Sequence, residues 1–105
     1  MPVIPGQLVL ASGVVCGNPA TLIYTSPAGS CSVIAGYGFT NPGVTPDIVI
    51  VYRDAPQNYG RLFTVTVPAG AVGWPWPSFL RIEPGELLYG FSQSGLTTVE
   101  VDGQL

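Results

Sequence analysis

The chain has 105 residues, the length of a single domain, and charged residues make up only 9% of it, against about 25% in ordinary soluble domains. It contains three Arg, no Lys, no His and six acidic residues, and residues 1–46 carry no charge at all. A net charge of −3 without a basic cluster argues against nucleic-acid binding, and no apolar run approaches the ~20 residues of a membrane span. We expect neighbouring copies or other proteins to cover much of this surface. The alternative is a wet surface of Ser, Thr, Asn and Gln.

The first part of the chain reads as an extended arm followed by a strand. Residues 1–6 contain two prolines, which keep this segment out of a central strand. The arm supplies four candidate interface residues: Pro2, Val3, Ile4 and Pro5. The mostly apolar residues 7–15 are expected to form the first strand of a single domain that spans 7–105.

Residues 20–40 predict a β-hairpin. Two segments of alternating pattern flank a Pro/Ala/Gly turn at 26–29, with Ala20, Leu22 and Tyr24 expected on one face. Such a hairpin places Cys31 opposite Tyr24 and Cys16 at its far end, beyond the ~7 Å Cα separation that a disulfide allows. The sequence therefore predicts two buried free thiols, as suits a reducing compartment.

The second half of the chain contains the clearest strands. Residues 47–53 and 61–67 both alternate, and Phe63, Val65 and Val67 are expected to face inward. Phe79–Ile82 forms a short strand, and residues 87–91 and 97–101 are expected to close the fold as a pair. This makes about eight short strands and no segment of helical period. We therefore predict an all-β fold, a single antiparallel β-sandwich or jelly roll.

Catalytic and metal-binding chemistry has little support in the composition. Without His or Lys, the commonest general base and the amine nucleophile are missing, and two distant cysteines do not make a zinc site. Glu83 and Glu86 could serve a glycosidase only if both faced one cleft; flanking a Pro-Gly turn, they are expected to solvate it. The sequence predicts no catalytic residue, no cofactor and no metal, and hence a protein that is not an enzyme.

The most specific local feature is the segment Trp74-Pro75-Trp76-Pro77. Two indoles on a proline-stiffened segment are suited to anchoring a protein interface. They could also stack on a sugar, or cap the open end of the core. Tyr59, in the loop before Arg61, is a weaker candidate anchor.

The order of these motifs resembles small β-sandwich proteins encoded in tailed-bacteriophage structural gene clusters. The resemblance covers residues 20–103 and rests on four segments: TLIYTSPAGSCSVIAGYGFTN, DIVIVYR, RLFTVTVPAG and LRIEPGELLYGFSQSGLTTVEVDG. This chain departs from the family pattern at Glu86, where the family has aspartate. The Trp-Pro-Trp-Pro segment and the uncharged arm are also not part of that pattern.

The resemblance implies a virion structural protein, synthesised in the host cytoplasm and assembled into the particle. We expect a capsid decoration (cement) protein that binds the major capsid protein or another virion protein. A homo-oligomer is implied, and a trimer would suit the local threefold sites of a capsid. Two alternatives stay open: a tail, baseplate or fibre-associated protein, and a carbohydrate-binding module on a host-recognition structure.

Overall fold

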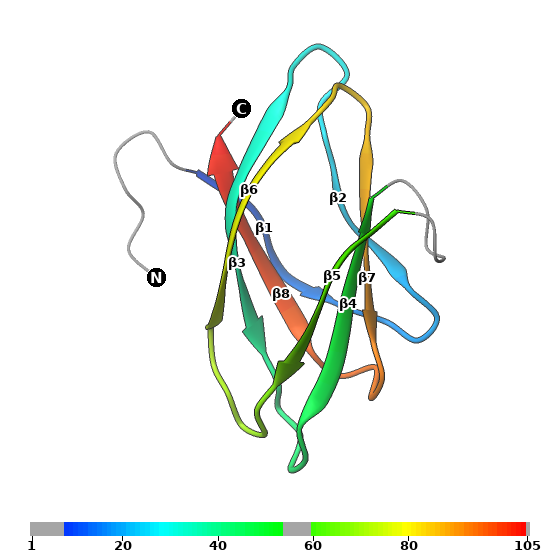
Figure 1. The fold of residues 1–105 in the computed structure, drawn as a ribbon, viewed down its shortest axis with the longest axis vertical. Coiled ribbons are helices and arrows are strands. Elements are labelled where there is room, and N and C mark those ends of the chain that lie inside the picture. The colour runs from blue at the N-terminus through cyan, green and yellow to red at the C-terminus, as the bar shows by residue number, and fades with distance from the viewer. Residues whose placement is uncertain (1–7, 54–59, 105) are drawn as a thin grey trace.

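Eight β-strands make up the part of the chain that the computed structural model describes, residues 8–53 and 60–104 (Figure 1). In chain order they are β1 (Leu8–Val15), β2 (Thr21–Thr25), β3 (Ser32–Thr40), β4 (Asp47–Arg53), β5 (Arg61–Val67), β6 (Trp74–Ile82), β7 (Leu87–Ser92) and β8 (Thr98–Gln104). These two stretches contain no helix, and so none that could cross a membrane. The predicted arm at residues 1–6, with Pro2, Val3, Ile4 and Pro5, lies outside the described residues, and so does Tyr59.

The strands form two four-stranded antiparallel sheets that pack face to face. Their orders are β1-β8-β3-β6 and β2-β7-β4-β5. The first strand thus pairs with the eighth, the second with the seventh, the third with the sixth and the fourth with the fifth. This nested pairing, folded over into two sheets, defines a jelly roll. The predicted all-β sandwich of about eight strands is confirmed.

The predicted hairpin at residues 20–40 is wrong. Its two strands, β2 and β3, lie in different sheets, and the connection between them crosses from one sheet to the other. The expected pairing of the last two strands is wrong for the same reason, since β7 and β8 also lie in different sheets. Turn residues and alternation show where a strand ends and which face is buried, but they do not distinguish a hairpin from a crossing between sheets.

A β-bulge also changes which side chains of β2 face inward. The register with β7 shifts between Leu22 and Tyr24, so that Ile23 and Tyr24 are both buried. Leu22, expected on the same face as Tyr24, is instead 46% exposed. One extra residue in a strand reverses the alternation beyond it, which a strict period of two cannot reveal.

The core lies between the two sheets and follows the alternation elsewhere. Val65 and Val67 are buried and Phe63 packs against the core, as predicted, while Thr64 and Thr66 are exposed. The largest fully buried apolar side chains come from both sheets: Phe39, Ile34, Ile82, Leu88, Val49, Val51, Val67, Val99 and Val101. Burying each such side chain stabilises the fold by about 1.5–3 kcal/mol.

The Trp-Pro-Trp-Pro segment is the first half of β6, an edge strand that pairs with β3 alone among the described strands. The strand is therefore longer than the predicted Phe79–Ile82. An edge strand tolerates these two prolines because a proline's missing N–H can face away from the sheet. Trp76 stacks on Phe63 with ring centroids 5.4 Å apart, which links the β6 edge of one sheet to the β5 edge of the other.

Both cysteines are free, as predicted. Cys16 is completely buried, but Cys31 is only partly buried, so the expectation of two buried thiols is wrong for the second. Cys31 lies in the connection between β2 and β3, beside the side chain of Arg81, rather than opposite Tyr24 in a hairpin.

Candidate docking surface

Four of the connections between strands lie toward one end of the sandwich: three are at the lower end in Figure 1, and the connection between β1 and β2 projects at the right, beside the one between β7 and β8. They are residues 16–20, 41–46, 68–73 and 93–97, and we call them together the loop end. Backbone hydrogen bonds join them in pairs: the amide of Cys16 donates to the carbonyl of Thr97 (2.8 Å), and that of Asn41 donates to Ala71 (2.9 Å). The amide of Ser94 also donates to the carboxylate of Asp47, the first residue of β4 (2.9 Å), so the two pairs of loops adjoin each other.

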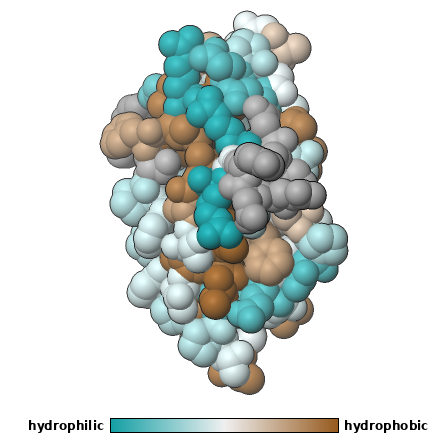
Figure 2. Space-filling model, turned by 45° about the vertical axis from the view of Figure 1, so that its right-hand side comes forward, coloured by the Kyte–Doolittle hydropathy of each residue, from teal (hydrophilic) through white to brown (hydrophobic). Residues whose placement is uncertain are grey.

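No residue of the loop end carries a charge, and three of its tips are apolar and exposed. Val44 is 94% exposed, Val72 84% and Leu96 53%. Figure 2 shows hydrophobic side chains, in brown, at the lower tip of the molecule and along the face in view, between pale and teal ones. An uncharged end with protruding apolar tips is suited to packing against another macromolecule, because its desolvation costs little.

The loop between β7 and β8 is positioned by a buried carboxylate. Asp47 is 2% exposed and accepts hydrogen bonds from the amide of Ser94 (2.9 Å) and from the hydroxyls of Ser92, Ser94 and Thr97. Burial alone would raise the pKa of Asp47, but these hydrogen bonds outweigh it and hold the pKa below its ordinary value. The ionised carboxylate thus gathers three side chains that lie 45 to 50 residues away in the chain.

A buried amide positions the loop between β3 and β4 in a similar way. Asn41 is 1% exposed; its side-chain amide donates to the carbonyls of Thr45 (2.9 Å) and Val67 (3.2 Å), and its oxygen accepts from the amide of Gly43 (2.9 Å). This arrangement uses the donor and acceptor capacity of the side chain within the loop. Val44 is consequently presented outward from a fixed turn.

Cys16, at the start of the loop end, is unsuited to nucleophilic chemistry. Burial, together with the negative charge of Asp47, raises the pKa of its thiol to about 12. The reactive form of cysteine is the thiolate, which is negligible at neutral pH for such a group. In the stretches that the structure describes, no group of three or more metal-ligating side chains comes together either.

A shallow groove of about 480 Å³ adjoins the loop end on the outer face of the β1-β8-β3-β6 sheet. Its lining residues include Ser12, Thr40, Thr98, Glu100 and Val72. Its volume falls within the range of small-molecule sites. Without a cationic side chain among its lining residues, the groove suits neutral, hydroxyl-bearing groups rather than anions.

The two predicted tryptophans have different environments. Trp76 is partly buried against the core and caps it through Phe63, as one of the three interpretations of the sequence expected. Trp74 is 40% exposed and follows directly on the loop between β5 and β6, next to the exposed Val72. The structure therefore places Trp74, but not Trp76, beside the docking surface.

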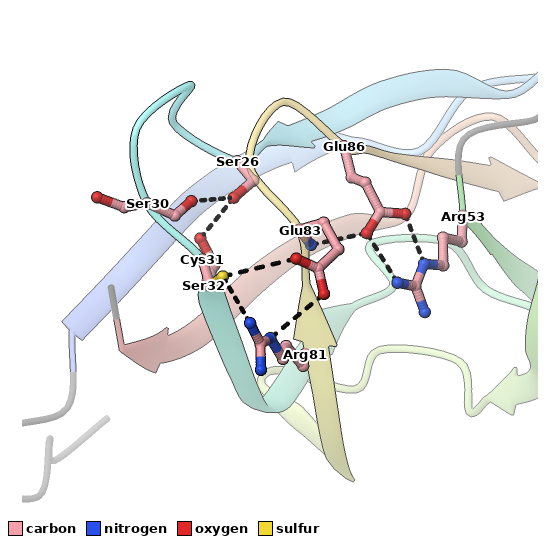
Figure 3. A network of polar contacts seen from close by, with 8 residues as sticks. All are labelled: Ser26, Ser30, Cys31, Ser32, Arg53, Arg81, Glu83 and Glu86. Carbon is pink, nitrogen blue, oxygen red and sulfur yellow. Dashed lines mark hydrogen bonds and ion pairs between the residues drawn. The ribbon is translucent and has the colours of Figure 1, made fainter.

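Four charged side chains form a network around the turn between β6 and β7, which lies at the opposite end of the sandwich (Figure 1); Figure 3 shows their contacts. Arg53 donates two hydrogen bonds of 2.7 Å to the carboxylate of Glu86, and Arg81 lies 3.3 Å from Glu83 and 3.2 Å from the sulfur of Cys31. The expectation that both glutamates solvate an exposed turn is therefore wrong for Glu86. Its side chain is only 16% exposed and joins the turn to β4.

The sequence analysis identified neither the loop end nor the role of Asp47. The absence of charge from alternate connections was visible in the sequence. That these connections share one end of the molecule follows only from the topology. Comparison of the chain with protein-family models, with curated proteins and with solved structures found no match.

Proposed function

We propose that this protein is a non-enzymatic structural protein of a bacteriophage virion that decorates and stabilises the capsid. One observation carries the proposal: the loop end is free of charge and exposes Val44, Val72 and Leu96, whereas an ionic network occupies the other end. The jelly roll is also an architecture of viral capsid domains, which is support by analogy only.

The proposed mechanism is attachment through the loop end to the major capsid protein or to another virion protein. The three apolar tips enter shallow pockets on the partner, and the rigid turns around Asn41 and Asp47 reduce the entropy lost on binding. In this arrangement the charged end, with Arg53, Arg81 and Glu83, points away from the particle, where its charges keep the particle surface soluble.

The experiment that tests the virion assignment is quantitative mass spectrometry of purified particles, with copy number measured against the major capsid protein. Copies in the hundreds, lost together with capsid stability under mild denaturant, would support decoration. A few dozen copies or fewer would move the protein to the tail, baseplate or fibre. Absence from the particle would refute every virion assignment.

The docking surface is tested by co-sedimentation of the purified protein with capsids that lack it. Val44→Asp and Val72→Asp would each bury an unpaired charge in the contact and weaken binding at least about tenfold. Ala28→Asp is the matched control, because Ala28 is exposed in the turn at the opposite end. If Ala28→Asp weakened binding and the two valine variants did not, the protein would attach by its other end.

A second candidate function, sugar binding, is favoured by the exposure of the Trp74 indole at the start of β6. Exposed indoles stack well on the faces of sugar rings. A glycan array with Trp74→Ala as the control tests this directly. Binding that the substitution abolishes, in a protein that still assembles into particles, would assign the protein to host recognition.

A further inference from the structure

The two sheets have four edge strands, β1 and β6 in one sheet and β2 and β5 in the other. Natural proteins interrupt such edges with prolines, bulges or charges, since unpaired N–H and C=O groups invite another strand. Three of the four edges carry such interruptions. β6 contains Pro75 and Pro77, β1 has two register shifts and Gly13 at a φ of 66°, and β2 is short and has a shift of its own.

β5 is the exception. Its register with β4 is continuous from the Asp47–Val67 pair to the Val51–Phe63 pair, and the one shift lies beyond, at the Arg61 end of the strand. The run from Phe63 to Val67 therefore contains five residues without proline, glycine, charge or bulge. Among the described strands it pairs with β4 alone, so its other edge is available for pairing.

We propose that β5 pairs in antiparallel fashion with β5 of a second copy, across a twofold axis at Val65, and joins two four-stranded sheets into one of eight strands. In this register Thr64 lies opposite Thr66 of the second copy, and Phe63 lies opposite Val67. Threonine pairs and aromatic–β-branched pairs are both favourable cross-strand neighbours. The Arg61 side chains of the two copies lie at opposite ends of the contact and do not repel each other.

The neighbouring edge of the other sheet supports this arrangement. Because Trp76 of β6 stacks on Phe63 of β5, the two edges lie on the same side of the sandwich. The twofold axis therefore brings the β6 edges of the two copies toward each other. Pro75 and Pro77 restrict strand pairing between these edges, so the contact there is made mainly by side chains. The half-exposed Trp74 lies on this same edge. The paired run from Phe63 to Val67 contains no residue of the loop end, and none of the exposed apolar tips of that end lies within it.

The test is the mass of the purified protein by sedimentation equilibrium over a wide range of concentration. The wild type is expected to approach twice the 11.0 kDa of the single chain. In Thr64→Lys/Thr66→Lys, the lysine at position 64 of each copy lies opposite the lysine at position 66 of the other. These two repulsive pairs should raise the dissociation constant of the dimer by about tenfold or more. Thr64→Lys/Thr66→Glu places opposite charges there in the same register and should restore the pair.

Both variants alter exposed positions only, and circular dichroism confirms that each is folded. The matched control, Leu22→Lys/Thr25→Lys, changes two exposed residues of β2, at the other edge of the same sheet, and should keep the mass of the wild type. A single-chain mass for the wild type at all concentrations would overturn the proposal. So would a threefold mass that Thr64→Lys/Thr66→Lys leaves unchanged, which would support a trimer built on another surface.

Discussion

Replacing Asp47 by Asn removes one charge from the interior and leaves the size of the side chain unchanged. The carboxylate accepts four hydrogen bonds, three of them at a single oxygen, from Ser92, Ser94 and Thr97. In asparagine, an NH₂ group replaces one of the two carboxylate oxygens. It faces either the three hydroxyls or the backbone amide of Ser94, so at least one of these donors loses its acceptor. Since hydrogen bonds to a charged acceptor contribute about 1.5–3 kcal/mol and neutral ones about 0.5–1.5 kcal/mol, we expect a loss of about 2–4 kcal/mol.

The assay is urea unfolding of wild type and Asp47→Asn at pH 7, supplemented by thermal unfolding, in which the Tm should fall by about 10–20 °C. Glu83→Gln is the control, because Glu83 forms an exposed ion pair whose loss should cost less than about 1 kcal/mol. Exchange of the Ser94 amide with solvent should also accelerate in Asp47→Asn, since this amide donates to the carboxylate.

The stability that Asp47 contributes is expected to depend on pH. The pKa of Asp47 is lower in the folded protein than its ordinary value of 3.8, so its stabilisation is complete above that value. It decreases as the pH falls below 3.8 and is lost below the folded-state pKa. The difference between wild type and Asp47→Asn should therefore shrink in strong acid. A difference that is absent at pH 7, or that persists unchanged below the folded-state pKa, would refute an ionised Asp47.

Three further predictions concern other groups of the sandwich. Asp102→Asn should stabilise the protein at pH 7 by about 0.5–1 kcal/mol in urea unfolding, because burial and a neighbouring glutamate raise the pKa of this carboxyl; a loss of stability would contradict this. A thiol reagent should label Cys31 in the native protein and Cys16 only after unfolding, as peptide mass spectrometry can show, since Cys16 is fully buried with a pKa raised to about 12. Glu86→Gln should cost about 1–2 kcal/mol, because it weakens two charge-assisted hydrogen bonds from Arg53; a neutral effect in urea unfolding would indicate that the ion pair is not formed.

The sequence was sufficient to predict where most strands lie, but not which strands pair with each other. Alternation identified most strand segments, including the inward face of β5, because burial on one face imposes a period of two. The pairing of β2 with β7 or of β1 with β8 has no local signal, since the paired residues are far apart in the chain. The turn at residues 26–29 is a real turn, but it connects two sheets.

The candidate docking surface was predictable only in part. The scarcity of charge was visible in the sequence, which left open whether the two tryptophans cap the core, anchor an interface or stack on a sugar; Trp74 lies beside the surface. Val44, Val72 and Leu96 lie toward the same end because every second connection of a jelly roll is at that end, which the residues alone do not reveal. Asp47 could not be identified as a buried anchor, because its partners belong to a distant turn.

The nested strand order also has a consequence for how the chain acquires its structure. Among the eight described strands, only β4 and β5 are neighbours both in the sequence and in a sheet; every other pairing joins strands separated by at least two others. Such topologies fold slowly, in milliseconds to seconds, because long loops must close before their contacts form. β1 in particular has no partner in its sheet until β8 has been synthesised. During translation the nascent chain therefore exposes apolar strands for most of its length, a period in which chaperones or early assembly partners would protect it from aggregation.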